Sequence, residues 1–376
     1  MSSVDSTPTF QASRFWSLDA IRGLAVLAVV CFHVLPSFES NTHLTDLSTV
    51  WVSWLKYGGS LGVSTFFVLS GFSIHLSQGR KLATKETTRQ SWGKFFQRRI
   101  WRLYPAYLGA LSLAIALNVT WALIRRRNPS LLLPSTWDFL SHLLLLHTLH
   151  SDTFFGIVPA FWFIGVQVHF YLLYPLFCWL IQRWTINRAL LIVLLCTLAF
   201  RVLSQSIVLP PTARPEFELV LWMNAPQRWF EWCFGAWVAN QVAQGIRLHI
   251  KYGWIVFFLI IFWISTGSTV KVIYEPILAS LVGFLIWCLV TNENHLQPHT
   301  VLRPILYVGQ ISYPVYLLHQ IFVPYIRSAI PPNLFNGAGL FVVILGLVMA
   351  VTLPLAACFH HWLELPFSKL KPKPQP

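Results

Sequence analysis

Long apolar runs separated by short polar segments dominate this chain of 376 residues. A helix of about 20 apolar residues crosses a bilayer, and ten of the runs are about that long. A shorter run at 138–150, "DFLSHLLLLHTLH", is predicted to form a re-entrant or interfacial helix. The pattern predicts an all-α, polytopic membrane protein with ten transmembrane helices, over residues 16–36, 58–78, 100–124, 160–182, 188–208, 228–245, 252–268, 273–291, 303–326 and 338–362.

The composition excludes a soluble globular domain. Hydrophobic residues make up 55% of the chain and charged residues 11%, whereas about a quarter of the residues of soluble domains are charged. The formal charge of +14 does not indicate nucleic acid, because the basic residues lie mainly in short loops between apolar runs. The six cysteines lie inside apolar runs without the spacing of a metal site, so no metal is expected.

The distribution of Lys and Arg predicts the orientation in the bilayer. A dense group of eight lies between residues 80 and 102, and placing this loop inside puts most basic residues on the cytoplasmic side. Both termini of this integral protein of the inner or plasma membrane are then cytoplasmic. "RRR" at 125–127 opposes this orientation. We expect one membrane domain, 16–366, between an N-terminal tail, 1–15, and a C-terminal tail, 367–376.

The first apolar run carries three titratable residues on one side. Arg22 lies three residues after Asp19, and His33 follows eleven residues later, which is close to three helical turns. At 1.5 Å per residue, Arg22 and His33 are roughly 16 Å apart along the axis. Ionisable residues inside a membrane indicate function, although a surface ion pair and a packed histidine would also fit this pattern. The shared face favours an inward, polar role.

Four further stretches carry candidate chemistry. "GVSTFFVLSGFSIHLS" (62–77) holds Ser70 among small residues that suit either helix packing or a ligand. In "QRRIWRLYPAYL" (97–108), Arg99 and Arg102 share a face that suits phosphate oxygens, whereas Arg98 fits ordinary flanking charge. Tyr104-Pro105 is predicted to break this helix. The last two stretches, "FWFIGVQVHFYLLYPLF" (161–177) and "GQISYPVYLLHQIF" (309–322), contribute the substrate-binding candidates Trp162, Gln167, His169 and His319.

Together with "FHHWLELPFSKL" (359–370), these stretches resemble the acyltransferase-3 family in order and spacing. Arg22 and His33 match the family's Arg-x10-His element, and "FFVLSGF", "RRIWRLYPAY", "SYPVYLLH" and "HHWLELPF" match its other segments. The resemblance covers Leu18 to about Phe367. It implies an integral-membrane enzyme that moves an acyl group, by family habit acetyl, from acyl-CoA to a hydroxyl of a cell-surface glycan or related acceptor.

The resemblance also implies roles for individual residues. His33 is expected to be the general base, with Arg22 and Asp19 lining a channel. Acyl-CoA would enter from the cytoplasm, bound by Arg98, Arg99, Arg102 and Ser70. Many relatives have two acidic residues and an amide where this chain has Gln167, Val168 and His169, so the roles of those acids do not carry over.

Two readings from other classes compete with an enzyme. A carrier or flippase for a glycan precursor could use the same polar face as a path, but such proteins often show internal repeats and broken helices in matched pairs, and the chain shows neither. A membrane sensor or scaffold would leave the spacing of Arg22 and His33 and the basic loop unexplained. The oligomeric state, a homodimer included, stays open.

Overall fold

The computed structural model describes residues 15–35, 46–83, 91–126, 128, 133–207, 215–266, 272–296, 299–331, 334–335 and 337–368. These residues form helices and connecting segments, and no strand occurs among them. Lys85, Arg89, Arg127 and nearly all of the two predicted tails lie outside the described residues. The predicted all-α, polytopic class is therefore confirmed.

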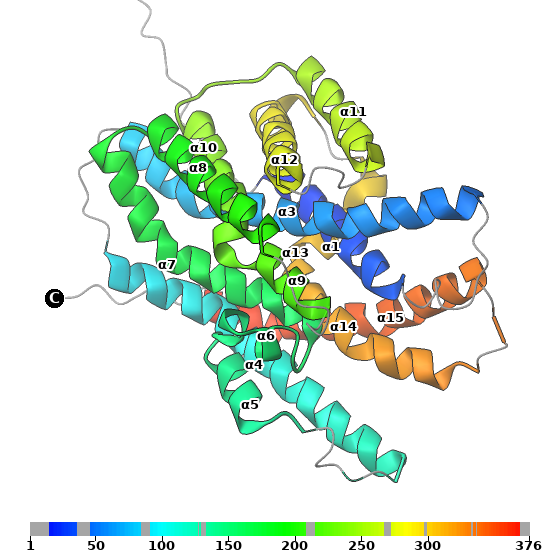
Figure 1. Ribbon diagram of the computed structural model, residues 1–376. Helices are drawn as coiled ribbons and strands as arrows, with labels where there is room; N and C mark the ends of the chain where they lie inside the picture. Colours follow the sequence, from blue (N-terminus) through cyan, green and yellow to red (C-terminus); the bar gives the residue numbers. More distant parts are fainter. Residues whose placement is uncertain are drawn as a thin grey trace, which may run out of the picture.

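The helices follow the apolar runs closely (Figure 1). The long helices are α1 (Trp16–Val34), α3 (Asp46–Ala83), α4 (Trp92–Ile124), α7 (Trp162–Arg183), α8 (Ile186–Gln205), α10 (Ala225–Ala243), α11 (Ile250–Thr266), α12 (Tyr274–Thr291), α14 (Ser312–Ala329) and α15 (Gly337–Phe359). The shorter ones are α5 (Thr136–Leu143), η2 (His147–Leu149), α6 (Ser151–Phe154), η3 (Pro159–Phe161), α9 (Pro215–Met223), η4 (Glu293–His295), η5 (Thr300–Leu302), α13 (Arg303–Gln310), the π turn η6 (His360–Glu364) and α16 (Leu365–Ser368).

Seven of the described helical segments are long and apolar enough to span a membrane. They are Trp16–Val34, Trp54–Lys81, Trp92–Ile124, Pro159–Arg183, Ile186–Gln205, Tyr274–Thr291 and Gly337–Phe367. The other three predicted crossings correspond to α10, α11 and α14. Helix α11 contains a shorter apolar segment, Ile250–Trp263, and α10 carries Arg228 and Glu231. That α10, α11 and α14 also cross the membrane, which would make ten crossings, remains a prediction.

Three predictions about where helices end or continue are wrong. Pro105 lies inside the continuous helix α4 and does not end it. Proline removes one backbone donor, but neighbouring groups in a membrane helix can compensate for that loss. Conversely, the predicted run 303–326 is divided between α13 and α14 at Ile311. The short run 138–150 is likewise divided, because Leu145 adopts a positive φ of 57° after α5.

Helix α3 is the centre of the bundle and packs most extensively against α10 and α1 (Figure 1). Glycines allow the close approach to α10. A Cβ atom on Gly71 would lie 1.8 Å from the carbonyl oxygen of Trp232, and one on Gly235 would lie 2.0 Å from that of Val68. Such small-residue contacts drive association of helices in membranes, where lipid is as apolar as the side chains.

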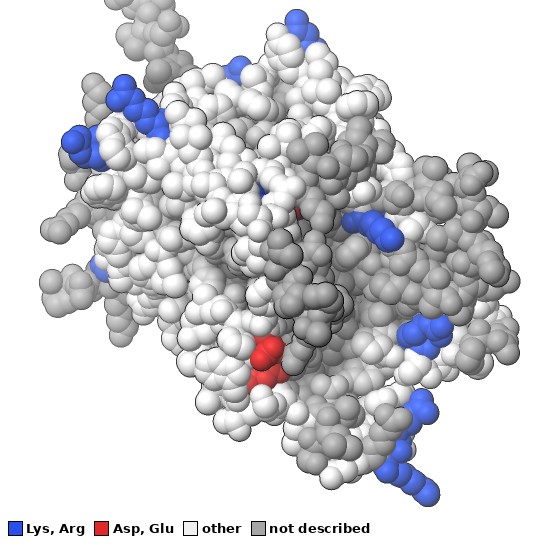
Figure 2. Space-filling model, viewed as in Figure 1, with Lys and Arg blue, Asp and Glu red and all other residues white. Residues whose placement is uncertain are grey.

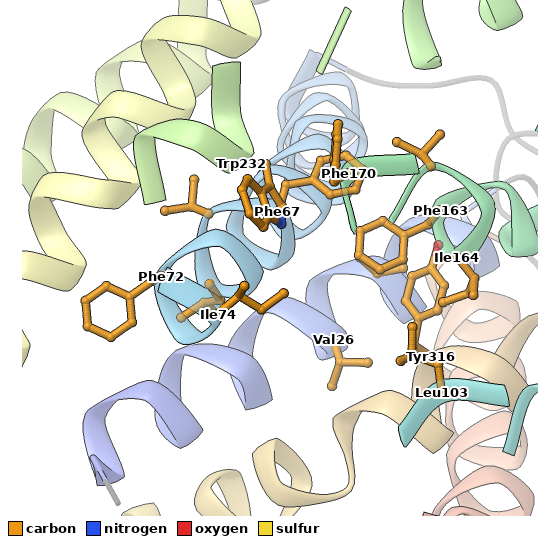
Figure 3. Close-up of a cluster of buried hydrophobic side chains, with 14 of the residues drawn as sticks. Val26, Phe67, Phe72, Ile74, Leu103, Phe163, Ile164, Phe170, Trp232 and Tyr316 are labelled. Atoms are coloured by element: carbon orange, nitrogen blue, oxygen red, sulfur yellow. The ribbon is translucent and has the colours of Figure 1, made fainter. Parts of the chain in front are cut away.

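Aromatic side chains fill the centre of the bundle. Figure 3 shows Phe67 of α3, Phe163 and Phe170 of α7 and Trp232 of α10 among the buried residues. Phe67 and Phe163 stack with ring centroids 4.7 Å apart. Large apolar side chains also cover much of the exterior, such as Phe258 and Leu191. The face in Figure 2 accordingly shows few charged side chains, and Lys and Arg lie mainly near its margins.

A buried set of charged side chains lies between α8, α10 and α12. Arg228 pairs with Glu231 at 2.5 Å and with Glu275 at 3.3 Å, and Glu275 also pairs with Arg201. Arg201, Arg228 and Glu231 are buried. Because buried charges are tolerated when they are paired, this network explains how α10 can carry them inside an apolar bundle.

The glycine contact predicts a sharp effect on stability. Gly71→Val should lower the melting temperature in detergent by several degrees, because the added atoms meet the backbone of α10 and overpacking costs about 1–3 kcal/mol or more. Gly346→Val in α15 is the matched control, since no atom of the described residues lies within 4 Å of its Cβ position. Equal melting temperatures for the two variants would contradict the close crossing of α3 and α10.

Candidate functional site

A cavity of about 490 Å³ lies between α1, α3, α4, α7, α13, α14 and the π turn η6. Its volume is in the range of small-molecule sites, which are usually 300–1,000 Å³. Charged, amide and aromatic side chains all line its wall. The charged and amide residues that line it are Asp19, Arg22, Arg98, Arg99, Arg102, Gln167, Gln310, His360 and Glu364.

The polar face of α1 contributes a paired arginine to the wall. Arg22 donates to the carboxylate of Asp19 at 3.1 Å and to Ser73 Oγ of α3 at 3.1 Å. Gly309 of α13 packs directly against this turn, since a Cβ there would lie 1.8 Å from the carbonyl oxygen of Asp19. The guanidinium is therefore held by two helices, and its planar fork can also meet a ligand in the cavity.

Helix α4 supplies the largest concentration of positive charge. Arg98, Arg99 and Arg102 all line the cavity, and with Arg22 they outnumber the carboxylates of Asp19 and Glu364. Arg99 Nε is buried and has no hydrogen-bond partner among the described residues. A buried donor without a partner is costly, so this atom suits an anionic ligand.

Two polar residues face each other between α3 and α7. Gln167 Nε2 donates to Ser70 Oγ at 2.6 Å, and Trp232 Nε1 donates to the same oxygen at 3.2 Å. Both Gln167 and Ser70 line the cavity, and Gln167 Oε1 is buried without a partner among the described residues. Two donors occupy the Ser70 oxygen, so its hydroxyl hydrogen is available to an acceptor, next to the unused acceptor of Gln167.

The π turn η6 forms the wall near the end of the described chain. His360 Nδ1 lies 2.7 Å from Glu364 Oε2, and both residues line the cavity. Single π turns inside helices are rare and often occur at functional sites. In the sequence, Glu364 could be only a carboxylate at a helix end, and the turn that brings it to the cavity has no signal in the apolar pattern.

Three of the aromatic side chains that line the cavity pack against one another. They are Phe66, Phe163 and Tyr316, and their ring centroids lie 4.9–6.1 Å apart. Figure 3 shows Phe163 and Tyr316 converging from different helices. The Tyr316 hydroxyl donates to the carbonyl oxygen of Ala160 at 2.8 Å, which holds the ring in place.

Next to Tyr316, a histidine of α1 and a histidine of α14 meet. His319 Nε2 lies 3.0 Å from His33 Nδ1, and the His319 ring centroid is 5.5 Å from that of Tyr316. His319 is fully buried, whereas His33 keeps part of its surface exposed. We call this pair the His33–His319 dyad. Neither member lines the cavity, but Tyr316, whose ring contacts His319, does.

The structure thus brings most of the predicted site residues into two adjoining places. The cavity unites Asp19, Arg22, Ser70, Arg98, Arg99, Arg102 and Gln167, and the dyad unites His33 and His319. Trp162 and His169 lie in neither. Trp162 packs in the aromatic core, with its ring 6.3 Å from that of Phe67. His169 is two residues from Gln167, so the helix turns it towards the opposite side.

His169 faces a short buried segment between α5 and α6. The Nδ1 atom of His169 lies 3.5 Å from Thr148 Oγ1. In the same segment, the rings of His142 and His147 stack with their centroids 4.1 Å apart. Burial lowers the pKa of His147 to about 3, so this imidazole is neutral near pH 7. The segment is predicted to be re-entrant or interfacial, and its histidines His142 and His147 are buried within the protein.

Sequence reasoning did not identify several residues of the site. Tyr316 is inside the "SYPVYLLH" stretch without being a candidate, and Ser73 stands out in the sequence only as one of the small residues of 62–77. Their residue types are ordinary for helix packing. Their roles become visible only when α1, α3 and α14 are placed around the cavity.

Comparison with known proteins identifies similar sequences. The family model described as acyltransferase domain, acyltransferase-3, matches residues 15–360. Peptidoglycan O-acetyltransferase OatA of Listeria monocytogenes is 24% identical over 94% of this chain and 56% of its own length. O-acetyltransferase OatA of Staphylococcus aureus is 24% identical over 83% of this chain and 51% of its own length.

A third relative, the putative peptidoglycan O-acetyltransferase YrhL of Bacillus subtilis, is 24% identical over 93% of this chain and 54% of its own length. The chain therefore spans about half the length of these curated relatives. No solved structure matches the chain.

Proposed function

Because the chain belongs to the acyltransferase-3 family, we propose that it is a membrane O-acyltransferase. It moves an acyl group, acetyl in the first instance, from acyl-CoA to a hydroxyl of a cell-envelope glycan. One observation carries the proposal: a cavity rich in arginine is lined by Tyr316, whose ring contacts His319 of the His33–His319 dyad. The relatives' names support acetyl as the group and a peptidoglycan-like polymer as the acceptor.

The arginine-rich part of the cavity suits the phosphates of the donor. Guanidinium groups bind phosphate oxygens through paired, charge-assisted hydrogen bonds, and Arg99 Nε has no protein partner among the described residues. The hydroxyl of Ser70 and the carbonyl of Gln167 match the amide groups of the pantetheine arm, which offer one acceptor and one donor each. The thioester then lies beside Tyr316, the lining residue that contacts the dyad.

His33 is the general base of the reaction. It removes the proton of the acceptor hydroxyl, whose oxygen attacks the thioester carbonyl carbon; the new C–O bond forms and the C–S bond breaks. The proton then passes from His33 to the sulfur of the departing CoA thiolate. Because the dyad does not line the cavity and Tyr316 contacts it from the cavity wall, the thioester reaches His33 after the Tyr316 ring moves.

The two substrates arrive from opposite sides of the membrane in this proposal. The arginines of α4 lie in the basic loop that the charge distribution places in the cytoplasm, together with both termini. His33 lies at the other end of α1, roughly 16 Å further along the axis than Arg22. Acyl-CoA thus binds from the cytoplasm, while the glycan hydroxyl meets His33 from the outer side of the inner or plasma membrane.

Cleavage of the thioester separates this function from that of a carrier or flippase. Purified protein in detergent is incubated with acetyl-CoA and a thiol reagent that reports free CoA. An acyltransferase releases CoA, by transfer or by slow leakage to water, whereas a carrier leaves the thioester intact. The His33→Ala variant is the control for contaminating hydrolases, and equal release by both proteins would count against the enzyme.

Loss of an α4 arginine should weaken donor binding. We expect Arg99→Ala or Arg102→Ala to raise the KM for acetyl-CoA by about tenfold or more, because a charge-assisted hydrogen bond contributes roughly 1.5–3 kcal/mol. Steady-state kinetics at saturating acceptor measures this. Arg183→Ala at the end of α7, outside the cavity, is the matched control for lost charge. A wild-type KM in both cavity variants would disprove the phosphate role.

Loss of His33 should affect turnover and spare donor binding. His33→Ala is expected to lower kcat by about 10²–10⁴, the usual contribution of a positioned base, with acetyl-CoA affinity near that of the wild type. His33→Gln should not restore activity, because an amide has no nitrogen basic enough to take a proton. Calorimetry gives the affinity, labelled donor gives the transfer rate, and a thermal melt confirms folding. Full transfer by a folded His33→Ala protein would end this mechanism.

A further inference from the structure

Backbone carbonyls assign the proton of His319. Its Nδ1 lies 2.7 Å from the carbonyl oxygen of Tyr316, one turn earlier in α14. A carbonyl oxygen only accepts hydrogen bonds, so Nδ1 carries the hydrogen and donates it. The neutral imidazole then has a lone pair on Nε2, which is the atom that faces His33.

The same reasoning assigns the proton of His33. Its Nδ1 lies 2.9 Å from the carbonyl oxygen of Val29 and 3.0 Å from His319 Nε2. Both neighbours are acceptors, so His33 Nδ1 must be the donor. If His33 Nδ1 carried a lone pair instead of a hydrogen, that lone pair would face the lone pairs of the Val29 oxygen and of His319 Nε2 at hydrogen-bond distance. These contacts would be repulsive. In the neutral ring, the lone pair of His33 is consequently on Nε2.

We propose that His319 is a positioning residue that holds His33 in the tautomer with a bare Nε2, the atom that takes the acceptor proton. The inference rests on the proposed function and adds a residue to it, since the sequence placed His319 among substrate-binding candidates. When Nε2 gains the hydroxyl proton, the resulting imidazolium keeps its Nδ1–H bond to the lone pair of His319. The proton leaves again from Nε2 to the CoA sulfur, so both rings end in their starting state.

A neutral partner suits this position. In serine hydrolases a buried aspartate fixes the tautomer of the catalytic histidine and stabilises its cation. His319 is fully buried, where an ionised carboxylate would be costly without further partners. An imidazole accepts the same hydrogen bond without a charge, and the Tyr316 carbonyl fixes its own tautomer.

Tyr316 also links this pair to the donor cavity. Its carbonyl oxygen accepts from His319, while its ring lines the cavity and packs against Phe163. One turn of α14 therefore both closes the cavity and sets the orientation of the base. Movement of the ring that admits the thioester occurs within a turn of the residue that aligns His33.

Two substitutions of His319 test the positioning role. His319→Leu fills the space but accepts no hydrogen bond, so kcat should fall by about 10²-fold or more while the KM for acetyl-CoA stays within about twofold of wild type. His319→Gln can accept from His33 Nδ1–H through its amide oxygen and should recover at least tenfold of the lost kcat. A role in binding the glycan would instead raise the acceptor KM at unchanged kcat, which would overturn the proposal.

The result is separable from failure of the proposed function. If folded His319→Leu keeps the wild-type kcat while His33→Ala loses it, the positioning role is wrong and the acyltransferase survives. If both retain full transfer, the proposed chemistry itself is wrong.

A spectroscopic measurement on wild-type protein guards against loss of folding in the leucine variant. Nitrogen NMR of histidine-labelled protein, with His33 assigned by its loss in His33→Ala, should show Nδ1 protonated and Nε2 bare near neutral pH. The opposite tautomer would overturn the proposal.

Discussion

The polar side of α1 must be enclosed, because charged and polar side chains without partners are costly inside a membrane. The bundle meets this constraint twice along one helix. Near the start, Arg22 is held by Asp19 and by Ser73 of α3. Near the end, His33 is held by its own backbone and by His319 of α14. The cavity and the dyad are the two places where neighbouring helices satisfy this face.

Close helix crossings make that enclosure possible. Gly309 brings α13 against the backbone of Asp19, and Gly71 brings α3 against α10. These contacts put Arg22 of α1, Ser70 of α3 and the arginines of α4 around one space. In the proposed reaction, the donor and the base approach each other from opposite ends of α1, and the ring of Tyr316 moves to let them meet. The proposed chemistry needs only this arrangement and one ring movement.

The sequence predicted the features that depend on local spacing. The apolar runs located the helices to within a few residues in most cases, and the three-residue spacing predicted the contact between Asp19 and Arg22. Features set by distant contacts were not accessible. The dyad joins residues that are 286 positions apart in the sequence. Gln167 lines the cavity and His169, two residues later, does not, and only the packing of α7 determines which of the two faces the cavity.

Backbone details were the other source of error. Proline usually ends helices in water, but α4 continues through Pro105 within a bundle that is too apolar for water to compete. The π turn at His360–Glu364 likewise has no signature in the hydrophobic pattern, although it brings a carboxylate to the cavity. At the π turn, the departure from regular helix geometry occurs where the side chains line the cavity.

The central claim is that the acyl group passes from a donor on one side of the membrane to an acceptor on the other. Transfer across the membrane of sealed vesicles tests this most directly. The purified protein is reconstituted with a soluble muropeptide disaccharide trapped inside, and acetyl-CoA labelled in its acetyl group is supplied only outside. Molecules with their basic loop outward should form labelled acetyl ester inside the vesicles while all CoA stays outside, and His33→Ala vesicles should form it about 10²-fold or more slowly. Label that reaches the trapped sugar only when CoA also enters, or no ester when donor and acceptor are on opposite sides, would contradict the account.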